Sequence, residues 1–403
     1  MTPSGFSPTR LARLGDVLKR HVGAGHVPGA LALVARRGEV HVVATGRLAF
    51  EGEGSGTPMA GDTVVRVTSW TKQLVAACAM TLVEDGTLRL DDPVDGFLPE
   101  LAGMRVLADP AGPLDDTVAA ERPTTLRDLL TCRLGTGAIL AEPGAVPLAD
   151  ALNALELADR PGGQLLSPDE WIRRLGALPL AHQPGERWMY HISPIVLGVL
   201  VARAAGRPLG EALRERICEP LGMKDTGIGI DAGSAARLAT AYTHDEATGA
   251  LAVEHGPDWL RHRLPVFKTG GSGLVTTADD FLAFTSALLA GGIHRGERVL
   301  SPQSVALMTT DHLTRRQREA STLVWTPVFQ QHFGWGFGMA VNLRRNHLAP
   351  SVGSYGWYGK YGTGWFNDPA RDLTAMLVTQ STATFRHRVF PQVWAAAYRA
   401  LDD

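Results

Sequence analysis

The chain has 403 residues, of which 45% are hydrophobic and 20% are charged, and its formal net charge is -2. This length permits a large core in two domains or in one divided domain, and the near-neutral charge argues against a nucleic-acid partner. No segment is apolar over a sufficient length to span a bilayer, and Met1 to Gly25 lacks the continuous apolar stretch of an export signal, so we expect a cytoplasmic protein without a membrane partner.

The hydrophobic pattern predicts strands at both ends of the chain and mostly helices between them. An amphipathic helix comes first, and two alternating runs that turn at Arg37-Gly38 then form a hairpin. This order favours an α+β protein in which a sheet domain of residues 1–70 and 266–403 is interrupted by a mainly helical domain of residues 71–265. In chain order, the predicted elements are a helix over 8–21, strands over 30–35, 40–45 and 63–67, helices over 73–82, 125–130 and 194–205, a helix that begins near Asp279, strands over 334–342, 362–367 and 373–379, and a final helix over 392–401.

The cysteines and histidines give no sign of a disulfide framework or a metal site. Cys78, Cys132 and Cys218 are odd in number and far apart, so we expect three free, buried thiols. The histidines lack the spacing of metal ligands. We therefore expect neither a metal nor another cofactor.

Ser69-Trp70-Thr71-Lys72 lies where a strand-like run passes into a helix-like run. Residues three apart on a helical turn share one face, so the Lys72 amine can approach the Ser69 hydroxyl. A serine activated in this way, near the positive end of a helix dipole, can serve as a nucleophile. The plainer interpretation is a helix-capping serine followed by a surface lysine, and the motif alone does not separate the two.

Two further stretches carry residues that suit the same chemistry. Tyr190 follows the Pro184-Gly185 turn, and a tyrosine beside a lysine ammonium can act as a base, although an ordinary half-buried tyrosine fits the pattern as well. Residues 356–364 combine glycines with aromatic residues in front of a strand, which permits the backbone to approach a ligand closely. An exposed edge strand here can donate one backbone N–H to an oxyanion hole, and the alternative is a plain aromatic hairpin loop.

These motifs stand in an order that is found in a known superfamily. They are Ser69-x-x-Lys72, Pro184-Gly185-x-x-Trp188-x-Tyr190, Gly273-Leu274-Val275-x-Thr277 and Trp357-x-Gly359, with supporting matches at 26–30, 62–69, 125–131 and 220–226. The chain resembles the serine β-lactamase superfamily over about residues 10–400, and most closely the family VIII carboxylesterases and class C β-lactamases. The resemblance implies a β-lactamase/penicillin-binding-like fold, an antiparallel sheet flanked by helices, with the active site at the interface of the two domains.

The departures from that pattern point to an ester substrate rather than a β-lactam. Class C β-lactamases carry Tyr-x-Asn, and this chain has Ile192 in place of the asparagine. They also carry Lys-Thr-Gly on the edge strand, where chain order here places Trp357-Tyr358-Gly359, the Trp-x-Gly typical of family VIII esterases. Lys268-Thr269-Gly270 matches the lactamase motif by coincidence, because it directly precedes the lead-in to a helix. Cys132-Arg133-Leu134-Gly135 replaces the family's usual His-Thr-Ser-Gly.

The resemblance implies that Ser69 attacks an ester carbonyl and forms an acyl-enzyme, with Lys72 and Tyr190 as the acid/base pair. Either member of the pair can be the resting base, because the two titrate as a coupled unit. The backbone N–H groups of Ser69 and Lys360 would form the oxyanion hole. The predicted substrate-binding residues are Trp70, Ile192, Trp357, Tyr358 and Gly359, of which Trp70, Trp357 and Tyr358 would be apolar walls for a short or medium acyl group.

We therefore predict a serine hydrolase that cleaves small-molecule carboxylic esters, and three alternatives stay open. A β-lactamase or D-alanyl-D-alanine peptidase fits the same motifs, although the missing asparagine and lysine count against it. An acyltransferase would share the acyl-enzyme and differ in the acceptor. A catalytically silent binding protein would have no need of Ser69, Lys72 and Tyr190 together. The sequence does not indicate the natural substrate or the oligomeric state.

Overall fold

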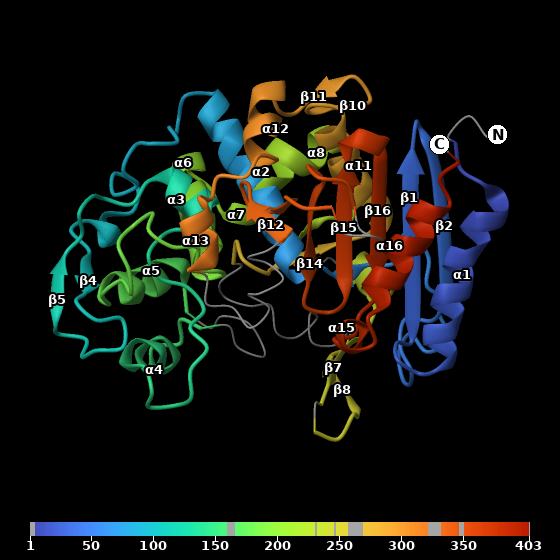
Figure 1. Ribbon diagram of the computed structural model, residues 1–403, viewed down its shortest axis with the longest axis horizontal. Helices are drawn as coiled ribbons and strands as arrows, with labels where there is room; N and C mark the ends of the chain where they lie inside the picture. The colour runs from blue at the N-terminus through green and yellow to red at the C-terminus, as the bar shows by residue number, and fades with distance from the viewer. Residues whose placement is uncertain are drawn as a thin grey trace.

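A seven-stranded antiparallel sheet forms one layer of the molecule, in the order β12-β13-β14-β15-β16-β1-β2 (Figure 1). The computed structural model describes residues 5–158, 166–229, 232–245, 247–256, 269–320, 332–345 and 350–402. The sheet joins the two ends of the chain, because β1 pairs with β16 as well as with β2. Its strands are β1 (Gly29–Arg36), β2 (Glu39–Gly46), β12 (Phe333–Trp335), β13 (Ala340–Asn342), β14 (Tyr355–Gly359), β15 (Thr363–Asp368) and β16 (Leu373–Val378).

The sheet has a hydrophobic core on each of its faces, because alternate residues of a strand point to opposite sides. In β1, Leu31 and Leu33 pack into the core that contains α2 (Thr71–Glu84) and α11 (Ala278–Leu289). Ala30, Ala32 and Val34 pack into the other core, under α1 (Pro8–Gly23) and α16 (Val389–Arg399). The sheet is thus covered by helices on both faces, as Figure 1 shows on its right-hand side for α1 and α16.

The predicted first hairpin is confirmed, and its turn has a clear physical basis. Arg37 and Gly38 connect β1 to β2 with φ values of 49° and 79°. Two successive positive φ values are the mark of a two-residue hairpin turn whose twist matches that of the strands. The predicted α+β class, with an antiparallel sheet flanked by helices, is likewise observed.

The part of the chain between β3 and β9 is mostly helical, and the long apolar helix predicted over 194–205 is its buried centre. This helix, α6 (Ile192–Ala205), has ten consecutive buried residues and packs against α2 and α3. Within the described residues, the other helices here are α3 (Leu126–Leu130), α4 (Pro147–Ala154), α5 (Pro168–Gly176), α7 (Leu209–Leu213), α8 (Glu219–Leu221) and α9 (Ala232–Ala235), with the 3-10 turn η2 (Pro99–Leu101) and the π-helical turn η3 (Arg214–Cys218). Two hairpins also lie here, β4 (Arg105–Leu107) with β5 (Thr117–Ala119) and β7 (Ala241–His244) with β8 (Leu251–His255).

A second, three-stranded sheet leads into the Ser69 segment. β9 (Leu274–Thr276) lies between β3 (Val65–Arg66) and β6 (Gly227–Ile228). The strand predicted over 63–67 is therefore only two residues long in the structure, followed at once by the 3-10 turn η1 (Thr68–Trp70) and α2. The remaining elements are β10 (Ile293–His294), β11 (Glu297–Arg298), α12 (Pro302–Met308), α13 (Arg315–Glu319), η4 (Pro369–Arg371) and α15 (Ala383–Arg386).

Two strand predictions near the C-terminus need correction. The single strand predicted over 334–342 is a pair, β12 and β13, because the chain turns between them at Gly338, whose φ is 78°. Since β13 pairs with the first residues of β14, β14 is an internal strand and not the predicted edge. Its last residues, from Trp357 to Gly359, pair with β15 but extend beyond the β13 pairing.

The prediction of three free, buried cysteines is confirmed: Cys78, Cys132 and Cys218 are all buried and unpaired with one another. Burial raises the pKa of each thiol to about 12. Such thiols stay protonated and are poor nucleophiles. Among the described helices, none alone has the length and hydrophobicity to cross a bilayer. Ile192–Ala204 and Leu209–Leu221 meet both criteria only when they are taken together, and the two segments are bent by 81° relative to each other.

Candidate active site

Ser69 and Lys72 meet at the start of α2, as the three-residue spacing predicts. Ser69 lies in the η1 turn, and the Lys72 Nζ donates a hydrogen bond to Ser69 Oγ over 2.9 Å. Nζ also donates to the carbonyl oxygen of Gly271 over 2.6 Å. Lys72 is only 1% exposed, whereas Ser69 is half-buried. The amine is thus held inside the protein and aimed at a hydroxyl that solvent can reach.

Tyr190 approaches the same hydroxyl from the segment before α6. Its OH lies 2.9 Å from Ser69 Oγ, and Lys72 Nζ lies 4.7 Å from the centre of its ring. The Tyr190 oxygen also accepts a hydrogen bond of 2.7 Å from the indole Nε1 of Trp357 in β14. Ser69 Oγ is therefore flanked by an amine and a phenol, and the phenol oxygen has its own N–H donor.

The 132–138 segment fixes Tyr190 by backbone hydrogen bonds. The Met189 N–H donates to Cys132 O and the Ala138 N–H donates to Tyr190 O, each over 2.8 Å. A Cβ at Gly137 would lie 2.7 Å from Tyr190 O, so only glycine permits this approach. The residues that replace the family's His-Thr-Ser-Gly thus belong to the segment that holds the backbone of Tyr190. The Tyr190 ring is further surrounded by the indoles of Trp188, Trp335 and Trp357.

The end of β14 packs on the backbone that precedes Ser69. A Cβ at Gly359 would lie 2.5 Å from Val67 O, so a side chain there would force the strand away. The next residue, Lys360, donates its backbone N–H to Thr68 Oγ1 over 2.7 Å. Its ammonium group points elsewhere and binds Glu254 Oε1 at 2.7 Å. The two predicted oxyanion donors thus belong to segments in direct contact.

Two of the predicted substrate-binding residues are buried in the core, and a third faces away from Ser69. Trp70 is fully buried, 4.2 Å from Phe281 between ring centres, because one residue along a helical turn points about 100° away from Ser69. Ile192, at the first position of α6, is 2% exposed within the core. Tyr358 follows Trp357 in a strand and so lies on the opposite face, against Phe390 of α16. The predictions that Trp70 and Ile192 line the pocket are wrong, and Tyr358 lies on the face of β14 that is turned away from Tyr190 and Ser69.

The structure also shows functional contacts that the sequence interpretation missed. Gly271 supplies the carbonyl that holds Lys72, and it follows the Lys268-Thr269-Gly270 match that was set aside. Lys268 lies outside the described residues, while Gly270 packs against the backbone of α6 at Pro194 O. Trp357 donates to Tyr190 and is 3% exposed, so it supports the phenol more than it walls a pocket. A backbone carbonyl leaves no trace in residue type, whereas the glycine pair 270–271 was a usable signal of close packing.

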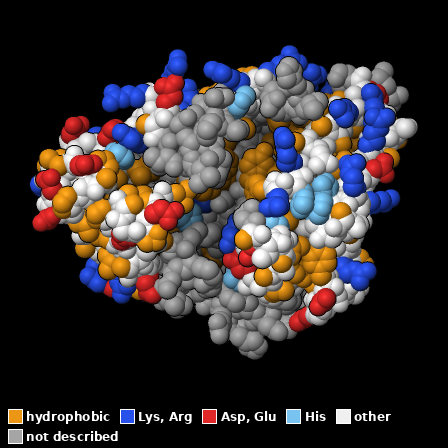
Figure 2. All heavy atoms as spheres, turned by 60° about the horizontal axis from the view of Figure 1, so that its bottom comes forward, with side chains coloured by type: hydrophobic (Ala, Val, Ile, Leu, Met, Phe, Trp, Pro, Cys, Tyr) orange, Lys and Arg blue, Asp and Glu red, His pale blue; other side chains and the backbone are white. Residues whose placement is uncertain are grey.

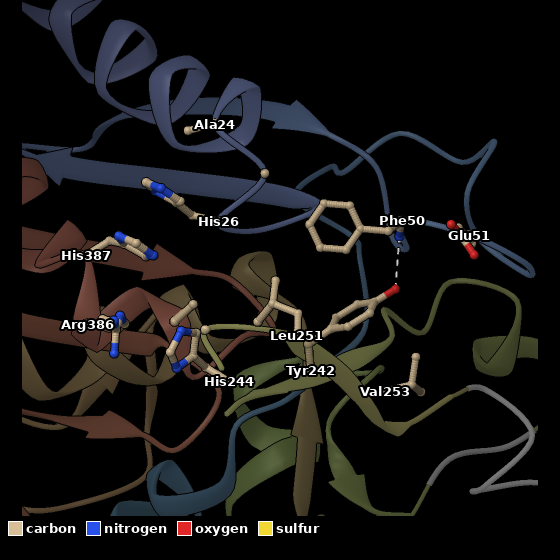
Figure 3. A pocket seen from close by; sticks show the side chains of 13 residues that line it. Ala24, His26, Phe50, Glu51, Tyr242, His244, Leu251, Val253, Arg386 and His387 are labelled. Carbon is tan, nitrogen blue, oxygen red and sulfur yellow. Dashed lines mark hydrogen bonds between the residues drawn. The ribbon is translucent and has the colours of Figure 1, made fainter. Parts of the chain in front are cut away.

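No group of three or more His, Cys, Asp or Glu side chains within the described ranges has the arrangement of a metal site. The histidines do cluster elsewhere, beside a hollow of about 750 Å³ between the end of α1, the β7–β8 hairpin and α15 (Figure 3). His26 and His387 stack there with ring centres 3.4 Å apart, and His244 lies edge-on to His387. Figure 2 shows histidine side chains gathered beside Lys and Arg on this side of the molecule. None of the residues around Ser69 Oγ lines this hollow.

Comparison with known proteins gives the same family from sequence and from structure. The beta-lactamase family model matches residues 14–398. Protein Rv1367c of Mycobacterium tuberculosis is 38% identical over 367 residues, and the alignment covers 89% of this chain and 86% of that protein. Esterase EstB of Burkholderia gladioli is 32% identical over 410 residues, and the alignment covers 94% of this chain and 95% of EstB. The structure of EstCE1, a hydrolase with promiscuous acyltransferase activity, superimposes with a TM-score of 0.78 at 26% identity and covers 97% of this chain and 99% of its own. The chain therefore belongs to the beta-lactamase family, and its relatives include an esterase.

Proposed function

We propose that this protein hydrolyses carboxylic esters of short to medium acyl chain through an acyl-enzyme on Ser69. The observation that carries the proposal is the pair of 2.9 Å contacts that Ser69 Oγ makes with Lys72 Nζ and Tyr190 OH. A serine hydroxyl is a weak nucleophile until a neighbouring base takes its proton. Here two candidate bases lie within proton-transfer distance of one oxygen.

In the first half-reaction, Ser69 Oγ bonds to the ester carbonyl carbon while its proton passes to the Lys72–Tyr190 pair. The bond between the carbonyl carbon and the alcohol oxygen then breaks, and Tyr190 returns the proton to the leaving alcohol. In the second half-reaction, the pair takes a proton from water as the water oxygen attacks the acyl carbon. The bond between that carbon and Ser69 Oγ then breaks, the pair returns the proton to Oγ, and the acid leaves. The Trp357 N–H stabilises negative charge on the Tyr190 oxygen, because hydrogen bonds to charged groups are stronger than those between neutral groups.

The carbonyl oxygen becomes negative as the tetrahedral intermediate forms, and backbone N–H groups can stabilise that charge. We assign this role to the N–H groups of Ser69 and Lys360. Gly359 supports the assignment, since its lack of a side chain brings the Lys360 segment against Val67 O. Loss of one such donor costs about 3 kcal/mol of transition-state stabilisation in enzymes of this kind of chemistry.

Two features favour esters over β-lactams. Trp357 stands where lactamases carry the lysine of Lys-Thr-Gly, so a cation that could bind a lactam carboxylate is replaced by an indole. Ile192 is buried and carries no amide to contact a lactam side chain. The relative EstB is an esterase by name, which agrees with this preference.

Acyl transfer to an alcohol is a second candidate, and one observation favours it. EstCE1 combines both activities. An assay of p-nitrophenyl butyrate turnover with and without a primary alcohol, with the ester product measured, decides how far transfer competes with hydrolysis.

The test of the proposed function is the Ser69→Ala variant, assayed on p-nitrophenyl acetate and butyrate. Since the nucleophile is absent, we expect turnover to fall by at least about a thousandfold, with an unchanged circular dichroism spectrum. Ser286→Ala in α11 is the matched control and should keep wild-type activity. Hydrolysis of nitrocefin, measured in parallel, should be far slower than that of the esters. Retained ester turnover in Ser69→Ala would refute the proposal.

A further inference from the structure

The hydroxyl group of Thr68, the residue before Ser69, lies on the side of the site that we assign to the oxyanion. The Lys360 N–H donates to Thr68 Oγ1 over 2.7 Å, and this pair of groups is accessible to solvent. If the N–H is to bind the ester carbonyl oxygen, that oxygen must take the place of Oγ1. We propose that Thr68 masks one donor of the oxyanion site: its side chain caps the Lys360 N–H in the free protein and turns away when the ester carbonyl arrives. The inference rests on the proposed function.

The backbone of Thr68 is held in an unusual conformation, with its side chain beside the Lys360 N–H. Its φ is 43°, in the left-handed region that β-branched residues rarely occupy. Its carbonyl oxygen accepts a 2.6 Å hydrogen bond from Thr71 Oγ1, which itself accepts the Leu274 N–H over 3.0 Å. Strained backbone next to a reactive group persists where the surroundings enforce it. Here the β9 strand and the first turn of α2 enforce it.

The close contact between β14 and the η1 turn lets the cap form without any backbone movement. A Cβ at Gly359 would lie 2.9 Å from Thr68 Oγ1, which shows how near the strand end is to this side chain. The Thr68 carbonyl stays hydrogen-bonded to Thr71 Oγ1, so the backbone does not have to move. The bond between Thr68 Oγ1 and the Lys360 N–H breaks when the side chain rotates about χ1 to another staggered rotamer. The substrate therefore competes with a tethered hydroxyl for one N–H donor.

The expected size of this competition is that of one hydrogen bond between neutral groups. Thr68→Ala removes the hydroxyl and keeps a Cβ in the same backbone conformation. We expect its kcat/KM for p-nitrophenyl esters, and its rate of Ser69 labelling by a fluorophosphonate, to rise about threefold to tenfold. Thr68→Ser keeps the hydroxyl and should restore the wild-type values. A merely structural role would not produce a gain that serine reverses.

An equal or lower kcat/KM in folded Thr68→Ala would overturn the inference. Should that variant not fold, the crystal structure of the wild-type protein with phenylboronic acid bound to Ser69 gives a second test. The expected result is a rotated Thr68 side chain with a boronate oxygen on the Lys360 N–H, and a retained bond between Thr68 and Lys360 would overturn the proposal. Failure of the proposed function is a separate outcome, since it would appear as fluorophosphonate labelling away from Ser69 or as turnover in Ser69→Ala.

Discussion

The two sides of Ser69 are built in different ways. On one side, Lys72, Tyr190 and Trp357 bring side-chain atoms together around two oxygens, with contacts of 2.7–2.9 Å. On the other side, the contact is made by backbone: Lys360 offers an N–H, and a threonine hydroxyl covers it. We refer to these as the proton-transfer side and the oxyanion side. Side chains can be recognised by type along a sequence, whereas a backbone donor depends on where the chain lies.

This difference explains why the proton-transfer side could be anticipated from the sequence and the oxyanion side only in outline. Helical spacing brings Lys72 to Ser69, and the resemblance of the Pro-Gly-x-x-Trp-x-Tyr segment to the family pattern adds Tyr190. Chain order also located the β14 end at Trp357-Tyr358-Gly359. That β14 is internal could not be read locally, because it depends on the separate β12–β13 hairpin.

Some errors of the sequence interpretation were avoidable and others were not. The turn geometry that pairs Ser69 with Lys72 also directs Trp70 into the core, and strand alternation puts Trp357 and Tyr358 on opposite faces. Both facts were available from the sequence. The partners in the Lys72–Gly271 and Lys360–Thr68 hydrogen bonds are separated by 199 and 292 residues in the sequence. No local sequence pattern therefore predicts these contacts.

The largest expected effect lies on the proton-transfer side. Lys72→Ala and Tyr190→Phe should each lower kcat by about 10²–10⁴-fold, since each removes a partner in proton transfer. Because both groups act on Ser69 Oγ, the double variant should lose much less than the product of the two single losses. Steady-state kinetics on p-nitrophenyl butyrate would be measured for the wild type, the two single variants and the double variant, which together form a double-mutant cycle. If the factor by which kcat falls in the double variant equals the product of the two single factors, the residues act independently. That result would contradict a coupled Lys72–Tyr190 pair.

A smaller effect should follow when only the indole donor is removed. Trp357→Phe keeps the ring and loses the N–H, and we expect kcat/KM to fall about tenfold, as for a hydrogen bond to a charged group. The acidic limb of the pH–rate profile should also move to higher pH, because the Tyr190 oxygen loses a donor that favours its anionic form. Tyr358→Phe is the matched control on the opposite face and should stay within about twofold of the wild type. Equal losses in both variants would contradict the assigned role of the indole.

The smallest effect concerns the stability of the oxyanion side. His255 in β8 lies beside Tyr361, with ring centres 6.1 Å apart, and burial, followed by repulsion from Arg66, lowers its pKa to about 4. In the unfolded chain its pKa is about 6.5, so below that value the unfolded state binds more protons than the folded state. The free energy of unfolding should therefore fall as the pH drops from about 6.5 to about 4, by on the order of 2 kcal/mol once the linkage energy is discounted for solvent screening of the imidazole.

Urea unfolding at a series of pH values measures this dependence. His255→Gln removes the titrating group and should flatten the decline between about pH 6.5 and pH 4 relative to the wild type. All other ionisable groups are shared by the two proteins, so the difference between their slopes isolates His255. Parallel slopes would show that His255 titrates alike in the folded and unfolded states.

The most direct test of a covalent mechanism is to trap the intermediate. The protein would be mixed rapidly with p-nitrophenyl butyrate, quenched in acid, digested and analysed by mass spectrometry. The account predicts one butyryl group on the peptide that contains Ser69, with fragment ions that place it on this residue, and no such adduct in Ser69→Ala. An adduct on another residue, or an adduct that persists in Ser69→Ala, would contradict it.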